Sequence, residues 1–211
     1  MSKKKKSKNS DEDEITFKVI TLGNSNVGKS SIIKRFIYDK FETKTISAIG
    51  FGTFNKEIEL KDGTKVILNL IDTAGQENYK ALSVNYIKNA DGVLLVYAND
   101  DRKSFEDIAG WIDSFIENTK IDLGNQLPAY LVENKKDSNC SVIDKEEIEN
   151  LINKYHIYGY IEVSTKDGYN IKEAFQNMAE MFIKIYGKKK NKENLKLIKS
   201  KRKKNGCNCD K

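Results

Sequence analysis

The stretch Gly23-Asn24-Ser25-Asn26-Val27-Gly28-Lys29-Ser30 decides the fold, because it lies between the apolar run 15–22 and the run 31–38, whose apolar residues have helical spacing. A strand, a glycine-rich loop and a helix in this order form the context that a phosphate-binding P-loop requires. The glycines let successive backbone N–H groups face one anion, and the helix N-terminus adds the positive end of its dipole. Lys29 can then reach the outer phosphates, and the Ser30 hydroxyl can bind Mg²⁺. The predicted phosphate-binding residues are Gly23, Asn24, Ser25, Asn26, Val27, Gly28, Lys29, Ser30 and Ser31.

Length and composition limit what this loop can belong to. With 211 residues and 38% hydrophobic content, the chain suits one compact domain with tails. The sequence has neither a run of eighteen apolar residues nor an apolar segment near its start, so we expect neither a membrane span nor a secretory signal. The three cysteines fit neither a disulfide framework nor a zinc cluster, which favours a reducing cytosolic environment.

The net charge of +6 is unevenly distributed along the chain. Residues 187–211 contain eleven Lys or Arg against two acids and carry +9, residues 1–14 carry +1, and the body between them therefore carries −4. Because the basic residues belong to the tail, the composition argues against a nucleic-acid-binding core.

The pattern of apolar residues predicts an alternation of strands and helices. The run Lys61-Asp62-Gly63-Thr64 separates two alternating segments and predicts a hairpin. Ser104 and Asp144 precede helical patterns and are candidate N-caps. We expect a doubly wound α/β fold, with a mostly parallel six-stranded sheet that contains one antiparallel hairpin strand. The expected strands are 15–22, 54–60, 65–71, 92–98, 129–133 and 158–163, and the expected helices are 31–38, 104–118, 144–155 and 171–186.

Ligands of such sheets lie over the carboxyl ends of the strands, so the loops that follow the third, fifth and sixth strands should face the same ligand as the P-loop. After the third strand, Asp72 supplies an acid for the Mg²⁺ shell, Gly75 can lie beside the outer phosphate, and Gln76 is placed to orient a water.

The loops after the fifth and sixth strands have the residue types that recognise guanine. In Asn134-Lys135-Lys136-Asp137, the last carboxylate can accept hydrogen bonds from the guanine N1 and N2 groups, which adenine cannot offer, while the Lys135 stem can lie along the base. The backbone N–H groups of Ser164-Thr165-Lys166 can meet the guanine carbonyl.

Together, these motifs make the chain resemble a small GTPase of the Ras superfamily, and within it a Rab. The similarity covers residues 15–186. The Rab assignment rests on Asp72-Thr73-Ala74-Gly75-Gln76-Glu77 with Tyr79, on Ile49-Gly50 before the hairpin, and on a basic tail with two cysteines. The resemblance implies GTP or GDP and Mg²⁺ as cofactors, and a GTP-binding domain over 15–186 between a disordered charged extension, 1–14, and a flexible basic tail, 187–211.

The resemblance also assigns roles to single residues. Ser30 would bind Mg²⁺ directly and Asp72 would hold it through water, Gly75 would contact the γ-phosphate, and Phe41 would stack edge-on to the base. The predicted catalytic residues are Gln76, which positions the hydrolytic water, and Lys29, which stabilises charge on the phosphates. The predicted guanine-binding residues are Asn134, Lys135, Asp137, Ser164, Thr165 and Lys166.

Departures from the family pattern bear on whether the switch works. Ala48 replaces the Thr that gives its hydroxyl to Mg²⁺, so only its backbone N–H remains for the γ-phosphate, and the coupling between that phosphate and loop order should weaken. Ser47 or Thr45 is the alternative hydroxyl donor.

Asn26 occupies a P-loop position that usually holds a small residue in the family, and its side chain either forms local hydrogen bonds or crowds the nucleotide. Glu133 replaces a usual Gly, and we interpret it as a solvated strand end.

The predicted function is therefore a Rab-like GTP/GDP switch of vesicle traffic. Trp111 is interpreted as a packing residue, and no arginine is placed to act as a finger, so fast hydrolysis should need an activating protein. The family also implies an exchange factor, an escort or GDP-dissociation-inhibitor type chaperone, and effectors that read the switch regions. One alternative is a guanine-nucleotide-bound scaffold that does not switch, which Ala48 makes credible. Another is a P-loop kinase or ATPase, which the guanine-reading loop disfavours.

The tail predicts attachment to the cytoplasmic face of an intracellular membrane. Cys207 and Cys209 resemble the paired cysteines that carry prenyl groups in Rabs, although two residues follow the pair. Two lipids, or one lipid with a polybasic segment, are what stable anchoring requires. The alternative is a solvated charge run or a nuclear-import signal.

Overall fold

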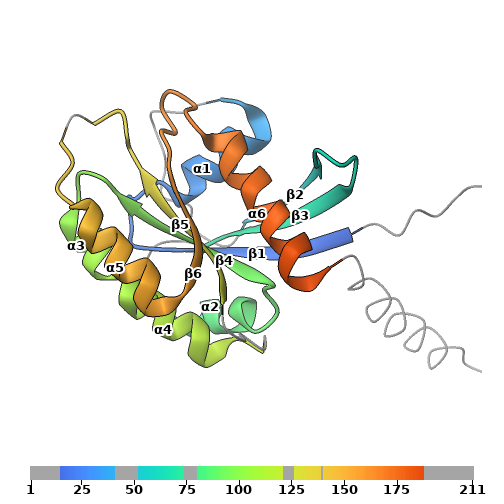
Figure 1. The fold of residues 1–211 in the computed structure, drawn as a ribbon, viewed down its shortest axis with the longest axis horizontal. Helices are drawn as coiled ribbons and strands as arrows, with labels where there is room; N and C mark the ends of the chain where they lie inside the picture. Colours follow the sequence, from blue (N-terminus) through green and yellow to red (C-terminus); the bar gives the residue numbers. More distant parts are fainter. Residues whose placement is uncertain (1–14, 41–51, 74–79, 121–125, 139, 188–211) are drawn as a thin grey trace, which may run out of the picture.

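Six strands form one sheet in the order β2-β3-β1-β4-β5-β6 (Figure 1). The computed structural model describes residues 15–40, 52–73, 80–120, 126–138 and 140–187. Only the β2–β3 pair is antiparallel, whereas β1 pairs in parallel with β3 and β4, and β5 pairs in parallel with β4 and β6. The predicted doubly wound sheet with one hairpin is therefore confirmed. The strands are β1 Ile15–Leu22, β2 Gly52–Glu59, β3 Lys65–Asp72, β4 Gly92–Ala98, β5 Leu127–Asn134 and β6 Ile157–Glu162.

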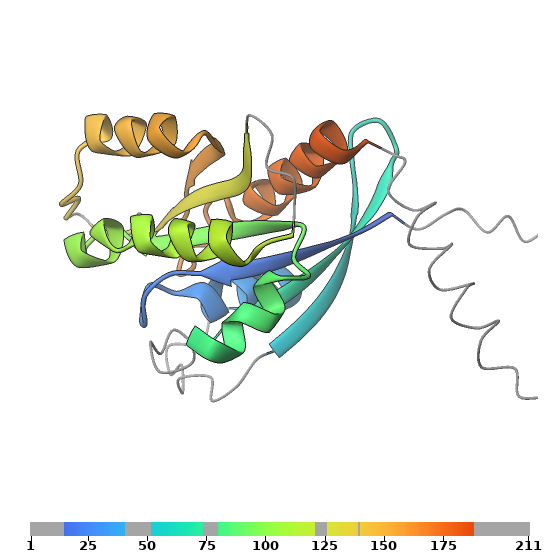
Figure 2. The ribbon, with the colours of Figure 1, turned by 90° about the horizontal axis from the view of Figure 1, so that it is seen from below.

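Helices cover both faces of the sheet (Figure 2). One apolar cluster lies between the sheet and α1 and α6, and a second lies between the opposite face and α2, α3, α4 and α5. Because both faces are covered, every residue of β4 and β5 is buried, as continuous apolar runs of parallel strands predict. The helices are α1 Lys29–Tyr38, α2 Lys80–Ile87, α3 Arg102–Glu106, α4 Ile108–Asn118, α5 Lys145–Tyr155 and α6 Ile171–Tyr186.

Two local predictions have different outcomes. Asp144 does cap α5, and its side chain forms a capping box with Glu147. The prediction of one helix over 104–118 capped by Ser104 is wrong: α3 is capped by Asp101, whose carboxylate accepts from the Ser104 N–H at 3.2 Å, and a new helix begins after Asp107. The Ser104 side chain is buried instead, and its hydroxyl accepts from the Ala98 N–H at 3.0 Å, at the end of β4.

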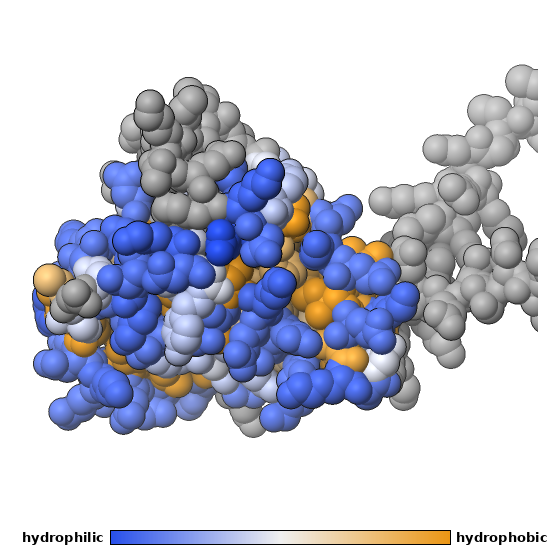
Figure 3. Space-filling view, turned by 90° about the horizontal axis from the view of Figure 1, so that it is seen from above, coloured by the Kyte–Doolittle hydropathy of each residue, from blue (hydrophilic) through white to orange (hydrophobic). Residues whose placement is uncertain are grey.

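The start of β1 and the end of α6 lie at the same end of the domain (Figure 1). The rings of Phe17 and Tyr186 stack there at 6.0 Å. The predicted extension 1–14 and the predicted tail 187–211, apart from Gly187, lie outside the described residues. No helix among the described ranges combines the length and apolar character that a bilayer crossing needs. The face shown in Figure 3 is mostly hydrophilic, with small apolar patches between charged side chains.

Candidate nucleotide-binding site

The P-loop connects β1 to α1 by a path that two glycines make possible. Gly23 has φ 143°, and a Cβ there would lie 2.1 Å from the Val96 carbonyl oxygen. Gly28 has φ 98°, and a Cβ there would lie 2.1 Å from Asn134 Nδ2. The loop is therefore pressed against the ends of both β4 and β5. Gly28 is also the N-cap of α1 and forms no side-chain capping bond, so the first turn presents its backbone N–H groups to a ligand.

Asn26 adopts the left-handed conformation, with φ 62°. This conformation explains why the position usually holds a small residue, because Gly and Asn tolerate it better than other residues do. Its side chain is exposed.

Lys29 is 4% exposed at the start of α1. Its ammonium group donates to the carbonyl oxygens of Gly23, at 2.8 Å, and Asn24, at 2.6 Å. Burial lowers the pKa of Lys29 to about 8, although the nearby Asp72 carboxylate acts to raise it. An anionic ligand would stabilise the charged form of this buried Lys29 ammonium group.

Asp72 ends β3 with its side chain buried beside the P-loop. Burial raises the pKa of its carboxyl group, whereas a hydrogen bond from the Ser30 side chain and the charges of Lys29 and Lys34 lower it. Oδ1 has no hydrogen-bond partner among the described residues. A serine hydroxyl next to a carboxylate oxygen with free acceptor capacity is the hard-oxygen donor set that suits Mg²⁺. The residues present therefore fit the metal that the sequence predicts.

The loops after β5 and β6 converge on the P-loop through Asn134. Its Nδ2 donates to the Val27 carbonyl oxygen at 2.8 Å, and its Oδ1 accepts from the Thr165 N–H at 3.3 Å. Asp137 Oδ1 accepts from the Ser164 hydroxyl at 2.7 Å, and Oδ2 lies 3.7 Å from Lys166 Nζ. The structure thus brings the three predicted recognition segments together at the carboxyl edge of the sheet.

Lys135 leaves β5 in a left-handed conformation, with φ 65°. Its Nζ lies 3.0 Å from Asp100 Oδ1, in the loop after β4. This ion pair fixes the end of the Lys135 side chain beside the loop after β4. The predicted site residues Phe41, Ala48, Gly75 and Gln76, and the predicted lipidation sites Cys207 and Cys209, lie outside the described residues, and their roles stay predictions.

A family model described as the Ras family matches residues 18–184. The chain belongs to the Ras family. It is 33% identical to "Ras-related protein Rab-9B" of Homo sapiens over 171 residues, which are 81% of this chain and 85% of that protein. It is 34% identical to "Ras-related protein Rab-9A" of Homo sapiens over 160 residues, 76% of this chain and 79% of that protein. It is also 34% identical to "Ras-related protein Rab-13" of Rattus norvegicus, over 82% of this chain and 83% of that protein.

These similarities confirm the predicted Rab-like small GTPase. The chain is a GTPase of the membrane-trafficking class, which hydrolyses GTP to GDP and phosphate. Proteins of the Ras family bind guanine nucleotides and Mg²⁺.

The sequence prediction missed a contact between the P-loop of this GTPase and the helices on the other face of the sheet. Asn24 donates to Asp107 Oδ2 at 2.8 Å and accepts from the Trp111 indole N–H at 2.9 Å. Trp111 does pack against the apolar cluster, as predicted, but its polar edge also holds a P-loop side chain. Asp107 is fixed in turn by Lys103, at 2.7 Å. The sequence did offer one signal for this contact, because the N–H of a buried tryptophan such as Trp111 usually needs a hydrogen-bond acceptor.

The interpretation of Glu133 as a solvated strand end is wrong, because its side chain is 3% exposed. Its carboxylate accepts from the hydroxyl groups of Tyr97, at 2.7 Å, and Tyr160, at 2.6 Å. Along β5, Glu133 lies on the same face as Leu131 and therefore points toward the helices α2, α3, α4 and α5.

Two buried threonines hold the start of the segment that contains Gly75 and Gln76 in the sequence. The Thr21 hydroxyl of β1 donates to the Ile71 carbonyl oxygen at 3.0 Å, and the Thr73 hydroxyl donates to the Thr21 carbonyl oxygen. Both side chains are almost fully buried. Thr73, the last described residue after β3, is therefore held against β1.

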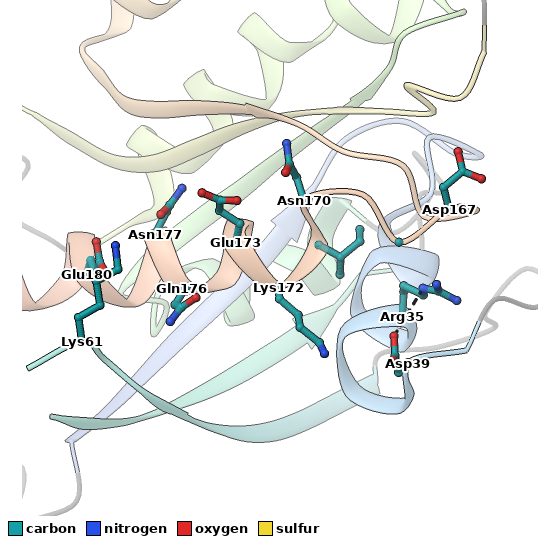
Figure 4. Close-up of a pocket in the computed structure, with 12 residues that line it drawn as sticks. Arg35, Asp39, Lys61, Asp167, Asn170, Lys172, Glu173, Gln176, Asn177 and Glu180 are labelled. Atoms are coloured by element: carbon teal, nitrogen blue, oxygen red, sulfur yellow. Dashed lines mark ion pairs between the residues drawn. The ribbon is translucent and has the colours of Figure 1, made fainter. Parts of the chain in front are cut away.

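A separate groove of about 590 Å³ lies between α1 and α6 (Figure 4). Arg35 and Asp39 from the end of α1 line it together with Lys172 and Glu173 of α6, and Arg35 Nε lies 3.9 Å from Asp39 Oδ1. No P-loop residue lines this groove, and its lining mixes cations with anions. It lacks the amide and lysine cradle that an anionic nucleotide requires.

Proposed function

We propose that this GTPase is an Mg²⁺-dependent GTP/GDP switch whose nucleotide lies between the P-loop and the segments 134–137 and 164–166. One observation carries the proposal: Asn134 bonds to both the Val27 carbonyl and the Thr165 N–H. The phosphate-binding and base-binding segments are therefore parts of one connected unit. Binding at either end would order the other.

At the phosphate end, Lys29 would exchange the carbonyl oxygens of Gly23 and Asn24 for phosphate oxygens. The exchange is favourable because an anionic partner compensates the burial of the ammonium group better than neutral carbonyls do. The backbone N–H groups at the start of α1 would bind the same phosphates. Ser25, Asn26 and Ser31 complete the predicted cradle.

At the base end, Asp137 would accept hydrogen bonds from the N1–H and the 2-amino group of guanine. Its bond from Ser164 fixes the carboxylate. The Lys166 N–H would meet the guanine carbonyl, while the Thr165 N–H keeps its bond to Asn134 Oδ1. Adenine offers neither donor at the matching positions, so the Asp137 carboxylate would gain no hydrogen bond from that base. Phe41 is proposed to stack against the base edge.

Ser30 and Asp72 would hold Mg²⁺, the Ser30 hydroxyl directly and Asp72 through water. The bound metal would neutralise the negative charge on the β- and γ-phosphate oxygens. The buried, unpaired Oδ1 of Asp72 supports this assignment. Ala48 offers no hydroxyl, so the ordering of its segment by the γ-phosphate is proposed to be weaker than in relatives with Thr.

For hydrolysis, Gln76 is proposed to orient the attacking water and Gly75 to contact the γ-phosphate, while Lys29 stabilises the developing charge. Without an internal arginine finger, intrinsic turnover should be slow, and an activating protein should accelerate it by about 10³ to 10⁵. Single-turnover GTP hydrolysis by wild type and Gln76→Leu tests these roles. We expect slow, Mg²⁺-dependent hydrolysis that the variant abolishes. Equal rates at every Mg²⁺ concentration would remove Gln76 from the mechanism, and nucleotide binding without hydrolysis would favour the non-switching scaffold.

The proposed working place is the cytoplasmic face of an intracellular membrane, with cycling through the cytosol. The basic tail 187–211 would bind anionic lipid headgroups, and prenyl groups on Cys207 and Cys209 would insert into the bilayer. Proposed partners are an exchange factor, an activating protein, an escort chaperone and effectors at the switch regions. Fractionation of cells that express the Cys207→Ser, Cys209→Ser variant is the test: we expect loss from membranes, and unchanged membrane recovery would rule out lipidation.

A further inference from the structure

A buried carboxylate lies directly beneath the proposed base-recognition loop. Glu133 is the penultimate residue of β5, one position before Asn134, and its side chain is 3% exposed. Oε2 accepts from the Tyr97 hydroxyl of β4 at 2.7 Å and from the Tyr160 hydroxyl of β6 at 2.6 Å. One carboxylate oxygen thus connects the ends of three adjacent strands.

The surroundings compensate the burial of this charge in part, since Oε1 has no hydrogen-bond partner among the described residues. Two phenol donors form charge-assisted hydrogen bonds, which are stronger than neutral ones. Burial, followed by the hydrogen bond to Glu133, raises the pKa of both the Tyr97 and the Tyr160 hydroxyl groups, so both remain donors at neutral pH. Lys136 Nζ lies 3.8 Å from Glu133 Oε1 and 3.0 Å from Glu162 Oε2, and it supplies a cation.

Lys136 belongs to the loop itself, as the third residue of the segment 134–137. Its backbone N–H donates to the Val163 carbonyl oxygen at 3.1 Å, and the Val163 N–H donates to the Glu133 carbonyl oxygen at 2.7 Å. Both the backbone and the carboxylate of Glu133 therefore act on the same short loop. Asp137, the proposed guanine acceptor, follows immediately.

Glu133 and Asn134 hold this loop from opposite sides of the sheet. Alternation along β5 directs Glu133 toward the layer of α3, α4 and α5, and Asn134 toward the P-loop on the other face. The loop that leaves the strand is therefore fixed at two points with different chemistry. This arrangement restricts its direction more than either contact alone.

A buried ion cluster is rarely a net gain in stability compared with apolar residues of similar volume. What the cluster provides here is a defined geometry at the start of a recognition loop. We infer that Glu133 is a positioning residue for guanine recognition, which through Tyr97, Tyr160 and Lys136 fixes the loop that presents Asp137 to the base. This inference rests on the proposed guanine-binding function of residues 134–137.

The test compares GDP with IDP, because inosine lacks only the 2-amino group that Asp137 would bind. Dissociation constants are measured for wild type and for Glu133→Gln, which keeps the shape but removes the charge. We expect GDP binding to weaken about tenfold and IDP binding about twofold, so that the GDP preference falls about fivefold. Tyr97→Phe, which removes one hydroxyl, should lower the preference about twofold and provides a milder variant if Glu133→Gln folds poorly.

Two controls separate positioning from stability. Ile112→Val opens a small space in the same buried layer and should lower thermal stability without changing the GDP to IDP ratio. Glu57→Gln makes the same isosteric change on the exposed face of β2 and should change neither property.

Each outcome has one interpretation. A wild-type protein that does not prefer GDP over IDP would contradict the proposed function itself. A wild-type preference that Glu133→Gln and Tyr97→Phe both retain, or a loss of affinity that is equal for the two nucleotides, would overturn the positioning role while leaving guanine binding intact.

Discussion

The protonation of Lys29 should couple nucleotide binding to pH. Burial lowers the pKa of Lys29 to about 8. Bound phosphates would stabilise the charged form and return the pKa toward or above its ordinary value. Binding above pH 8 must therefore take up a proton, and the affinity should fall as pH rises.

The expected size follows from the pKa itself. With a pKa of about 8, about nine tenths of the free protein carries neutral Lys29 at pH 9, so the affinity should be about tenfold lower at pH 9 than at pH 7. The stability of the free protein should change in the opposite direction. Between pH 8 and pH 10.5 the unfolded chain binds the proton that the folded protein has lost, so the free energy of unfolding should rise with pH, by up to about 3 kcal/mol.

Equilibrium titration of GDP between pH 7 and pH 9 measures the first effect, and urea unfolding of the nucleotide-free protein measures the second. Lys29→Arg is the matched control, since its guanidinium stays charged throughout this range. If the arginine variant binds too weakly for titration, calorimetry of the wild type in buffers with different ionisation enthalpies reports the proton uptake directly. Parallel pH profiles for the two proteins, or no proton uptake at pH 9, would refute the reasoning.

Three further substitutions test separate parts of the site. Trp111→Phe keeps the aromatic packing but removes the hydrogen-bond donor to Asn24. Loss of one hydrogen bond of about 1 kcal/mol should accelerate GDP release about fivefold in a stopped-flow displacement assay. An unchanged release rate would limit the role of Trp111 to packing. Asp72→Asn should reduce the gain in GTP affinity that Mg²⁺ gives, measured with and without chelator, because only the direct Ser30 ligand remains. A gain equal to that of wild type would exclude Asp72 from the metal site. Gly28→Ala places a methyl group against the Asn134 amide at a left-handed backbone position. The free energy of unfolding should therefore fall by at least about 2 kcal/mol, and GDP binding should be lost. GDP binding equal to that of wild type would contradict the described packing.

Much of the fold could be predicted because local and long-range signals agree. The expected bounds of β1, β4 and α6 match the structure, since each is a clear apolar pattern ended by turn residues or polar residues. The hairpin followed from Asp62-Gly63 between two alternating segments, which pair as antiparallel strands. The order of the recognition loops followed from the rule that parallel strands present their carboxyl ends at one edge.

What could not be predicted depended on partners from distant parts of the chain. Nothing near Glu133 in the sequence shows that Tyr97 and Tyr160 donate to it, so a charged strand end was interpreted as solvated. The break between α3 and α4 was missed because the apolar spacing continues across Asp107. That carboxylate accepts from Asn24, a residue 83 positions away in the sequence.

The most direct test of the proposed base recognition is to exchange the acceptor at Asp137 for an amide and measure which base binds. Wild type should prefer GDP over XDP and ADP by at least about a hundredfold, because Asp137 accepts from two guanine donors. Asp137→Asn should reverse the order toward XDP, since the amide can donate to the xanthine carbonyl that replaces the 2-amino group. If the wild type binds GDP and ADP equally, or if Asp137→Asn leaves the GDP preference unchanged, the guanine pocket described here is wrong.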